Sequence, residues 1–215
     1  MKRLFFVLIL GLVTAAIGGY FLNNNLSKPT TVVNVQTETL LAGSQLPLPK
    51  PLTEFSLIDT NNQLFTQHSL LGQWTLMFFG YAQCPETCPK TLALVNAFWK
   101  PLMEKQAHNT SSPRTRFVFV TLDPKSDTVQ NLQQFLGHFN SEFIGLTGEE
   151  SEIQKLSKSC NIYSWQDPNL DAKGQKVIDH TAAFLLINPQ GQIQALFTPP
   201  HDPSNILKDL EVLIH

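Results

Sequence analysis

The sequence predicts an α/β sandwich, in which helices cover both faces of a central sheet, preceded by a single transmembrane helix. Three observations favour this prediction. From residue 51 onward, short apolar β-rich runs alternate with helical patterns, which is typical of helices packed on a sheet. A hairpin pattern precedes that alternation, and an uncharged apolar run stands near the N-terminus. With 215 residues, of which 42% are hydrophobic, the chain is long enough for one globular domain with a full core.

The apolar run is predicted to anchor the chain in a membrane. Lys2 and Arg3 precede residues 4–22, nineteen positions without a charge, which can just span a hydrocarbon core of about 30 Å. A cleaved signal peptide is the alternative, because it also has a basic start and an apolar middle. We favour the anchor, since the apolar run is long for a signal core. The basic residues then place residues 1–3 in the cytoplasm, and the remaining chain is exported.

Residues 23–50 are predicted to form a flexible tether between the anchor and the domain. They begin with three asparagines, and prolines at positions 47, 49 and 51 stiffen the end of the segment. The globular domain is then expected to occupy residues 51–215.

The domain opens with a predicted hairpin and a buried strand. Residues 55–59 and 63–66 alternate between apolar and polar side chains, and Asn61-Asn62 supplies the turn between them. Residues 74–79 are nearly all apolar and predict a core strand. A helix follows the two cysteines of the next segment, with apolar positions at helical spacing up to residue 102.

The remaining elements continue the alternation. Strands are predicted at residues 116–122, 143–146, 180–187 and 193–197. Helices are predicted from residue 128 to about 139, at residues 149–159 and at residues 204–213, and a polar loop at residues 163–177. The resulting order, β-α-β-α-β-α-β-β-α behind an N-terminal β-hairpin, is that of a thioredoxin-like sandwich.

The charge of the chain argues against one class of partner. It carries 15 basic and 17 acidic residues, with a formal charge of −2 and no basic block. Binding to nucleic acid depends on clustered lysines and arginines that neutralise phosphates. We therefore expect no nucleic-acid partner.

Cys84 and Cys88 are the strongest candidates for chemistry. They lie four positions apart, after the strand at residues 74–79 and at the start of the predicted helix. On a helix such positions are neighbours, about 5–6 Å apart at Cβ. A helix N-terminus favours negative charge and hence the thiolate, which binds metals and attacks disulfides. The sequence predicts a metal site or a redox-active pair that can form a disulfide; two structural thiols are the alternative.

The spacing of the cysteines favours a metal. Thiol-disulfide exchange enzymes usually carry two residues between their cysteines, whereas this chain carries three. Two thiolates are soft ligands that select monovalent copper, with zinc as the alternative. Because two ligands leave a metal under-coordinated, a third ligand is expected nearby.

His180 is the candidate for this third ligand, with a structural role left open. It begins a predicted strand and can reach the sheet edge that carries the cysteines, and Asp179 beside it can orient the ring. Cys160 is interpreted as a small buried hydrophobe, with metal binding as the alternative. Asp123 either supports the site or caps a turn. The other histidines are interpreted as structural or surface residues: His68, His108, His138, His201 and His215.

Four motifs, in this order, resemble the Sco/SenC family. They are Phe79-Gly80-Tyr81-x-x-Cys84-Pro85-x-x-Cys88-Pro89, Val120-Thr121-Leu122-Asp123-Pro124-x-x-Asp127-Thr128, Ile144-Gly145-Leu146-Thr147-Gly148 and Asp179-His180-Thr181. The resemblance extends from about residue 51 to residue 213. Glu86 stands where the family commonly has aspartate.

The resemblance implies a membrane-anchored, thioredoxin-like copper protein that helps assemble the binuclear copper centre of cytochrome c oxidase. It implies copper ligands at Cys84, Cys88 and His180. The implied partners are the oxidase subunit that carries this centre, and copper donor proteins or thiol reductases. The implied location is the inner membrane, with the domain on its periplasmic side or in the equivalent mitochondrial intermembrane space.

Two functions remain open at this point. The first and favoured one is a copper metallochaperone. The alternative is an enzyme, a thiol-disulfide reductase that keeps the cysteines of a copper-protein client reduced. The reductase needs Cys84 and Cys88 but not His180, so the histidine distinguishes the two functions.

Overall fold

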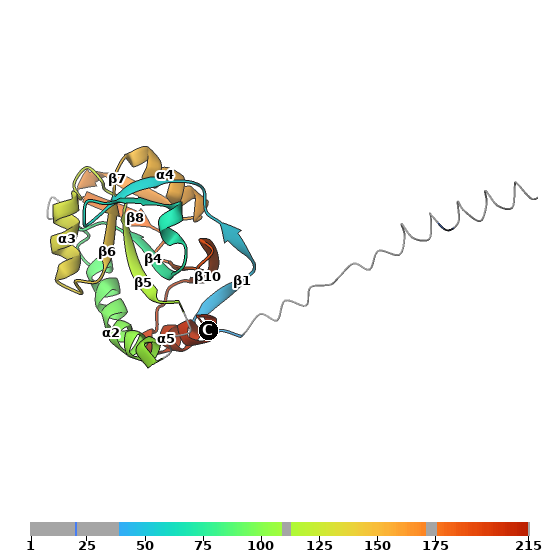
Figure 1. The fold of residues 1–215 in the computed structure, drawn as a ribbon. Coiled ribbons are helices and arrows are strands. Elements are labelled where there is room, and N and C mark those ends of the chain that lie inside the picture. The colour runs from blue at the N-terminus through green and yellow to red at the C-terminus, as the bar shows by residue number, and fades with distance from the viewer. Residues whose placement is uncertain (1–19, 21–38, 109–112, 171–175, 215) are drawn as a thin grey trace, which may run out of the picture. The chain divides into compact units, whose positions relative to one another are not determined.

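A mixed eight-stranded sheet forms the centre of the domain (Figure 1). The computed structural model describes residues 20, 39–108, 113–170 and 176–214. The strands are β1 (Gly43–Pro51), β2 (Ser56–Asp59), β3 (Leu64–Thr66), β4 (Trp74–Gly80), β5 (Thr115–Thr121), β6 (Ile144–Thr147), β7 (Ser164–Leu170), β8 (Lys176–His180), β9 (Phe184–Ile187) and β10 (Gln192–Phe197). The helices are the 3-10 helix η1 (Gln67–Leu70), α2 (Thr87–His108), α3 (Val129–Gly137), α4 (Glu150–Ser159) and α5 (Pro203–Leu213).

Strand β4 is the middle of the sheet. The strand order is β1-β10-β9-β4-β5-β6-β2-β3, with β4 parallel to β5 and antiparallel to β9. All seven residues of β4 are buried, as expected for a strand covered on both faces. Its side chains alternate, so that Leu76 and Phe78 enter one core cluster while Met77 and Phe79 enter the other.

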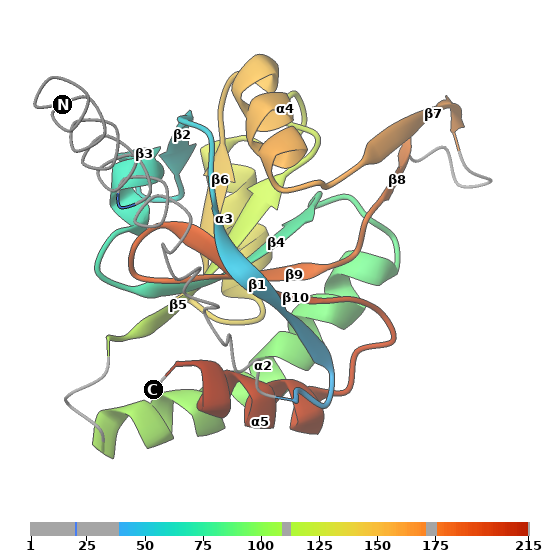
Figure 2. The same cartoon turned by 90° about the vertical axis from the view of Figure 1, so that its right-hand side faces the viewer.

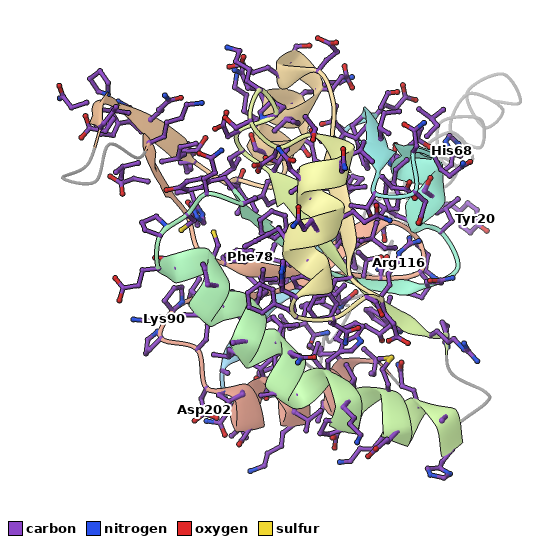
Figure 3. All side chains as sticks on the ribbon, turned by 90° about the vertical axis from the view of Figure 1, so that its left-hand side faces the viewer. Tyr20, His68, Phe78, Lys90, Arg116 and Asp202 are labelled. Carbon is purple, nitrogen blue, oxygen red and sulfur yellow. The ribbon has the colours of Figure 1, made fainter. Side chains whose placement is uncertain are left out.

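Helices cover both faces of this sheet. Apolar side chains of α2, α3 and α5 join the cluster that contains Phe78, and those of α4 and η1 join the cluster that contains Phe79. Figure 2 shows α2 and α5 together on one side of the sheet and α4 on the other. Figure 3 shows Phe78 in the interior beside α2, with Lys90 at the edge of the molecule. The predicted thioredoxin-like α/β sandwich is confirmed.

The predicted N-terminal hairpin is also confirmed. Strands β2 and β3 pair antiparallel, with Ser56 opposite Thr66. The turn between them contains Asn62 at a φ of 59°, a left-handed conformation that asparagine tolerates. The side chain of Asp59 fixes the turn, since its Oδ1 accepts the backbone N–H groups of Asn61 and Gln63, both at 2.8 Å.

The end of the predicted tether is instead a strand. Strand β1, Gly43–Pro51, pairs antiparallel with β10 at the edge of the sheet. Its register shifts between Gln45 and Lys50, the stretch that holds Pro47 and Pro49. Proline cannot donate to a ladder but is tolerated on an edge strand. The proline-rich composition that predicted a linker therefore belongs to an irregular edge strand.

Asp209 of α5 fastens the start of β1. It is only 2% exposed, and its carboxylate accepts the N–H groups of Leu41, Ala42 and Gly43 at 2.8, 2.7 and 2.8 Å.

Asp209→Ala is expected to lower the free energy of unfolding by about 2 kcal/mol, because hydrogen bonds to a charged acceptor are lost. Urea denaturation measures the change. Glu211→Ala on the same helix, which removes a surface ion pair with Lys105, is expected to cost less than about 1 kcal/mol. Equal losses in the two variants would contradict the assigned role of Asp209.

The polar loop predicted at residues 163–177 is largely a second small sheet. Within the part of the chain that the structure describes, strands β7 and β8 pair with each other and with no other strand, and Ser164 lies opposite His180. Figure 2 shows this hairpin projecting from the body of the domain. Six of the seven residues of β7 are exposed, so the strand lacks the apolar alternation that identifies a half-buried strand. His180 is consequently the last residue of β8, whereas the sequence predicted it as the first residue of the following strand.

The predicted stub at residues 1–3, the anchor at residues 4–22 except Tyr20, and the tether up to residue 38 lie outside the described residues. Within the described part of the chain, no helix is both long and apolar enough to cross a membrane.

Candidate metal centre

The two cysteines lie where the chain leaves β4 and enters α2. Cys88 is in the first turn of α2, and Cys84 lies in the preceding loop rather than on the helix. The N–H of Cys88 donates to Sγ of Cys84 at 3.3 Å, so the thiol occupies the position that a capping oxygen usually fills. Cys84 is 8% exposed and Cys88 is fully buried, and both thiols are free.

Hydrogen bonding gives the two thiols different pKa values. The thiol of Cys88 and backbone N–H groups at the start of α2 lower the pKa of Cys84, despite its burial. The same hydrogen bond with Cys84, together with burial, raises the pKa of Cys88. The thiol of Cys84 therefore has the lower pKa of the pair, which agrees with the predicted effect of the helix N-terminus.

His180 approaches the cysteines from β8. Its Nε2 lies 4.0 Å from Sγ of Cys88, and its Nδ1 lies 3.3 Å from the carbonyl oxygen of Thr181. Because a carbonyl oxygen only accepts, Nδ1 carries the proton and the lone pair of Nε2 faces the thiol. Burial lowers the pKa of His180, which favours the neutral imidazole that binds metals. The carbonyl of Thr181 thus orients the ring, whereas the sequence assigned this role to Asp179.

The three side chains fit a soft metal ion by their chemistry, and the distance between Cys88 and His180 is close to that of two ligands of one ion. Zinc bonds to thiolate and imidazole are about 2.3 and 2.0 Å long, so two such ligands in a trigonal site are about 3.7 Å apart. The 4.0 Å between Cys88 and His180 is close to this separation. Among the described residues, no three His, Cys, Asp or Glu side chains are already drawn together as a complete metal site. A metal bound by both cysteines would form two metal–sulfur bonds, and any thiol proton would be released.

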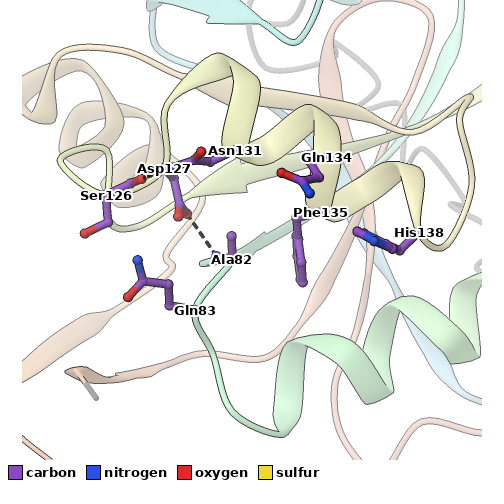
Figure 4. Close-up of a pocket in the computed structure, with 8 residues that line it drawn as sticks. All are labelled: Ala82, Gln83, Ser126, Asp127, Asn131, Gln134, Phe135 and His138. Carbon is purple, nitrogen blue, oxygen red and sulfur yellow. Dashed lines mark hydrogen bonds between the residues drawn. The ribbon is translucent and has the colours of Figure 1, made fainter. Parts of the chain in front are cut away.

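Two residues that hold the cysteine loop were not singled out from the sequence. The hydroxyl oxygen of Tyr81 accepts the N–H of Ile178 at 3.2 Å, which joins the loop to β8. The carboxylate of Asp127 accepts the N–H of Ala82 at 3.0 Å and the hydroxyl of Thr121 at 2.6 Å. Figure 4 shows Asp127 reaching Ala82 beside a pocket of about 250 Å³. The only signal for either residue was its place within the motifs around Cys84 and Asp123.

Asp127→Ala is expected to lower the free energy of unfolding by about 2 kcal/mol, because Ala82 N–H and the hydroxyl of Thr121 lose their buried acceptor. Hydrogen exchange of the Ala82 amide should become faster, which separates a loosened loop from a general loss of stability. Asp167→Ala, which removes a half-buried carboxylate that accepts the N–H of Asn169 on the β7–β8 hairpin, is the control and should leave the exchange of the Ala82 amide unchanged. Unchanged exchange at Ala82 in the Asp127 variant would contradict the role of this carboxylate.

The remaining candidates lie away from the three side chains. Cys160 is 2% exposed in the core cluster on the opposite face of the sheet, and burial raises its pKa to about 12. This supports its interpretation as a buried hydrophobe. Asp123 forms an ion pair with Lys176, at 2.9 Å, and Glu86 forms a solvent-exposed pair with Lys90. His201 donates to the carbonyl of Ala182 at 2.9 Å, as expected of a structural histidine.

Comparisons with known proteins identify the family of this chain. The SCO1/SenC family profile matches residues 46–215. The SCO2-like protein of Rickettsia felis is 30% identical over 74% of this chain and 74% of its own length. The mitochondrial SCO2 protein of Saccharomyces cerevisiae is 30% identical over 64% of this chain, but the matched segment spans only 44% of the yeast protein.

Solved structures show the same fold. The structure of Bradyrhizobium japonicum ScoI with copper bound is 31% identical, with a TM-score of 0.65, and the match covers 75% of this chain and 98% of that one. Yeast Sco1 with copper bound is 26% identical, with a TM-score of 0.67, over 78% of this chain and 88% of that one. Since the family profile covers most of the chain and these relatives share its fold, the protein belongs to the SCO1/SenC family.

Proposed function

We propose that this protein is a copper metallochaperone that binds monovalent copper through Cys84, Cys88 and His180. One observation supports the proposal most strongly. Two free thiols lie at the same edge of the sheet as an unprotonated imidazole nitrogen, and Sγ of Cys88 is 4.0 Å from Nε2 of His180. Soft thiolates select monovalent copper among the common metals. Copper is bound in the structures of two relatives, ScoI of Bradyrhizobium japonicum and Sco1 of yeast.

The proposed destination of the copper is the binuclear copper centre of cytochrome c oxidase, in the subunit that carries it. BsSco, another protein of this fold, is described as a member of the Sco family of cytochrome c oxidase assembly proteins. Copper would be supplied by a donor protein, and the cysteines would be kept reduced by a thiol reductase. The anchor at residues 4–22 would hold the domain on the periplasmic side of the inner membrane, or in the mitochondrial intermembrane space.

The unequal burial of the ligands suits transfer by ligand exchange. Cys88 is fully buried and Cys84 is 8% exposed, whereas His180 is half-buried. A thiolate of the client would therefore reach a bound ion most easily from the side of His180. Three ligands leave an open position at which the incoming ligand can bind before one of the original ligands leaves.

Copper titration and transfer test the proposal together. The reduced protein is titrated with monovalent copper against a chromophoric chelator, and one equivalent should bind. The loaded protein is then mixed with the copper-free oxidase subunit, and the visible absorption of the binuclear centre should appear. Cys88→Ser should abolish both results, while Cys160→Ser, which changes a buried thiol outside the site, should leave both unchanged. Copper binding by the Cys88 variant at the affinity of the wild-type protein would refute the proposed ligand set.

A thiol-disulfide reductase is the second candidate. It is favoured by the lowered pKa of Cys84 beside the raised pKa of Cys88. The thiolate of Cys84 would attack a client disulfide, and Cys88 would then displace the client, so that two thiols of this protein become a disulfide and one client disulfide becomes two thiols. The copper-free reduced protein is mixed with the oxidised oxidase subunit, and the released thiols are counted. Release that survives His180→Ala would support a reductase, and no release from the wild-type protein would exclude it.

A further inference from the structure

Strand β8 is held to the body of the domain along one face. Among the described strands it pairs with β7 alone, and the two form a sheet of their own. Side chains alternate along a strand, so Lys176, Ile178 and His180 share a face of β8. Each of these three residues contacts a residue at or beside the cysteine loop. The position of His180 relative to the cysteines therefore depends on what Lys176 and Ile178 contact.

Lys176 makes the contact at the far end of β8. Its Nζ lies 2.9 and 3.2 Å from the two carboxylate oxygens of Asp123 and 3.0 Å from the hydroxyl of Ser126. Asp123 is 5% exposed and lies two residues after the end of β5, the strand that pairs with β4 along its whole length. A hydrogen-bonded ion pair with a buried carboxylate is a strong and directional contact. It joins β8 to the sheet edge from which the cysteine loop leaves.

Ile178 makes the contact in the middle of β8. Its side chain is 6% exposed within the core cluster that also contains Cys84 and Cys88, and its N–H donates to the hydroxyl of Tyr81. The same hydroxyl also donates to the carbonyl oxygen of Lys176 at 3.5 Å, so both backbone contacts of Tyr81 converge on one atom. Contacts that converge on one atom can act as a pivot, and a contact elsewhere on the strand is needed to fix its angle. Lys176 and His180 are four residues apart, about 13 Å along a strand. A small rotation about Ile178 therefore displaces His180 from the cysteines.

We propose that Lys176 is a positioning residue for the metal site: its ion pair with Asp123 fixes the angle of β8 and thereby holds the His180 imidazole against Cys88. The part of the proposal that concerns copper rests on the proposed function, since it takes His180 to be a ligand. The part that concerns the position of the ring does not, because the ring can be observed in the metal-free protein.

The metal-free test follows the ring of His180 by NMR. The ring packs edge-on against Phe78, with 5.9 Å between ring centroids, so its proton resonances are displaced by the aromatic ring current. The protein is labelled at histidine, and the His180 resonances are assigned by their absence in His180→Ala. In Lys176→Met they should move toward the values of an exposed histidine, whereas Lys176→Arg, which keeps the charge and the hydrogen bonds, should restore them.

Two further variants separate positioning from general destabilisation. Lys176→Met leaves Asp123 buried without its partner, which can unfold the domain, so Lys176→Met is also combined with Asp123→Asn, and the His180 resonances should shift in this double variant too. Lys90→Met removes an exposed lysine paired with Glu86, at the surface of α2 in Figure 3, and should leave them unchanged. Wild-type His180 resonances in the folded double variant would overturn the proposal.

The copper test uses the same variants. Lys176→Met and the double variant should bind monovalent copper about 10–100-fold more weakly than the wild-type protein, the usual effect of removing a residue that supports a metal ligand. Lys176→Arg should recover most of the affinity. If His180→Ala binds copper as tightly as the wild-type protein, the ligand assignment fails, while the NMR result still decides the positioning role of Lys176. Wild-type copper affinity in the double variant, with loss of affinity in His180→Ala, would overturn the role of Lys176 alone.

Discussion

His180→Ala is expected to weaken the binding of monovalent copper by more than about 100-fold, since loss of a ligand should exceed the 10–100-fold effect of losing a residue that supports one. Among the described residues, the imidazole of His180 is the candidate nitrogen ligand that contacts the thiols, since its Nε2 lies 4.0 Å from Sγ of Cys88 and carries no proton. Competition with a chromophoric chelator measures the affinity of the reduced protein. The release of copper by acid should also change, because a neutral imidazole no longer takes part.

The control for this prediction is His138→Ala. His138 follows α3 and lines the pocket beside the cysteine loop, so it lies near the site without belonging to the ligand set (Figure 4). Its removal should leave copper affinity unchanged. Thermal unfolding of both variants shows whether the fold is preserved, which matters because His180 also packs against Phe78. Equal copper affinities of the two variants would remove His180 from the proposed site.

In the reduced, metal-free protein, iodoacetamide is expected to modify Cys84 about 1,000-fold faster than Cys88 or Cys160. Only a thiolate reacts, and hydrogen bonds lower the pKa of Cys84 while the pKa values of the other two thiols are raised. Cys84 is also the most exposed of the three, at 8% against 0% and 2%. The other thiols react only after local opening, which costs several kcal/mol and accounts for the expected ratio.

Mass spectrometry of peptides sampled over time measures the three rates. The reaction of Cys84 should persist below neutral pH, because its pKa is lowered. Cys88→Ser is an informative variant, since a serine hydroxyl is a different donor to Cys84, and it should shift the pH at which alkylation slows. Alkylation of Cys84 and Cys88 at similar rates would show that the thiol of Cys84 does not have the lower pKa of the pair.

The parts of the fold that the sequence predicts are those whose burial leaves a pattern. Strand β4 is apolar at nearly every position because both of its faces are covered, and this run identifies it without further information. Strands β1 and β7 leave no such pattern. Strand β1 lies at the sheet edge and is interrupted by prolines, and strand β7 is exposed and polar. The sequence of each therefore predicts a loop, although its backbone is paired with another strand.

In the proposed metal centre, too, some residues can be predicted from the sequence and others cannot. Cys84 and Cys88 are candidates from their spacing at the start of a helix, whereas the sequence leaves a structural role open for His180 until the family resemblance implies that it is the third ligand. Tyr81, Asp127 and Lys176 support the site through hydrogen bonds with residues 45 to 97 positions away or through an ion pair across 53 positions. Such contacts depend on the register of separate elements, which composition and periodicity do not specify.

The candidate ligands come from two separate sheets, because the cysteines leave the main sheet after β4 while His180 ends a strand of the β7–β8 hairpin. An ion bound by all three would act as a cross-link between them. By thermodynamic linkage, the ordering of the hairpin would then be coupled to occupancy, and its amides would exchange more slowly in the loaded protein. A partner that touches only the hairpin could thereby distinguish a loaded molecule from an empty one without contacting the metal.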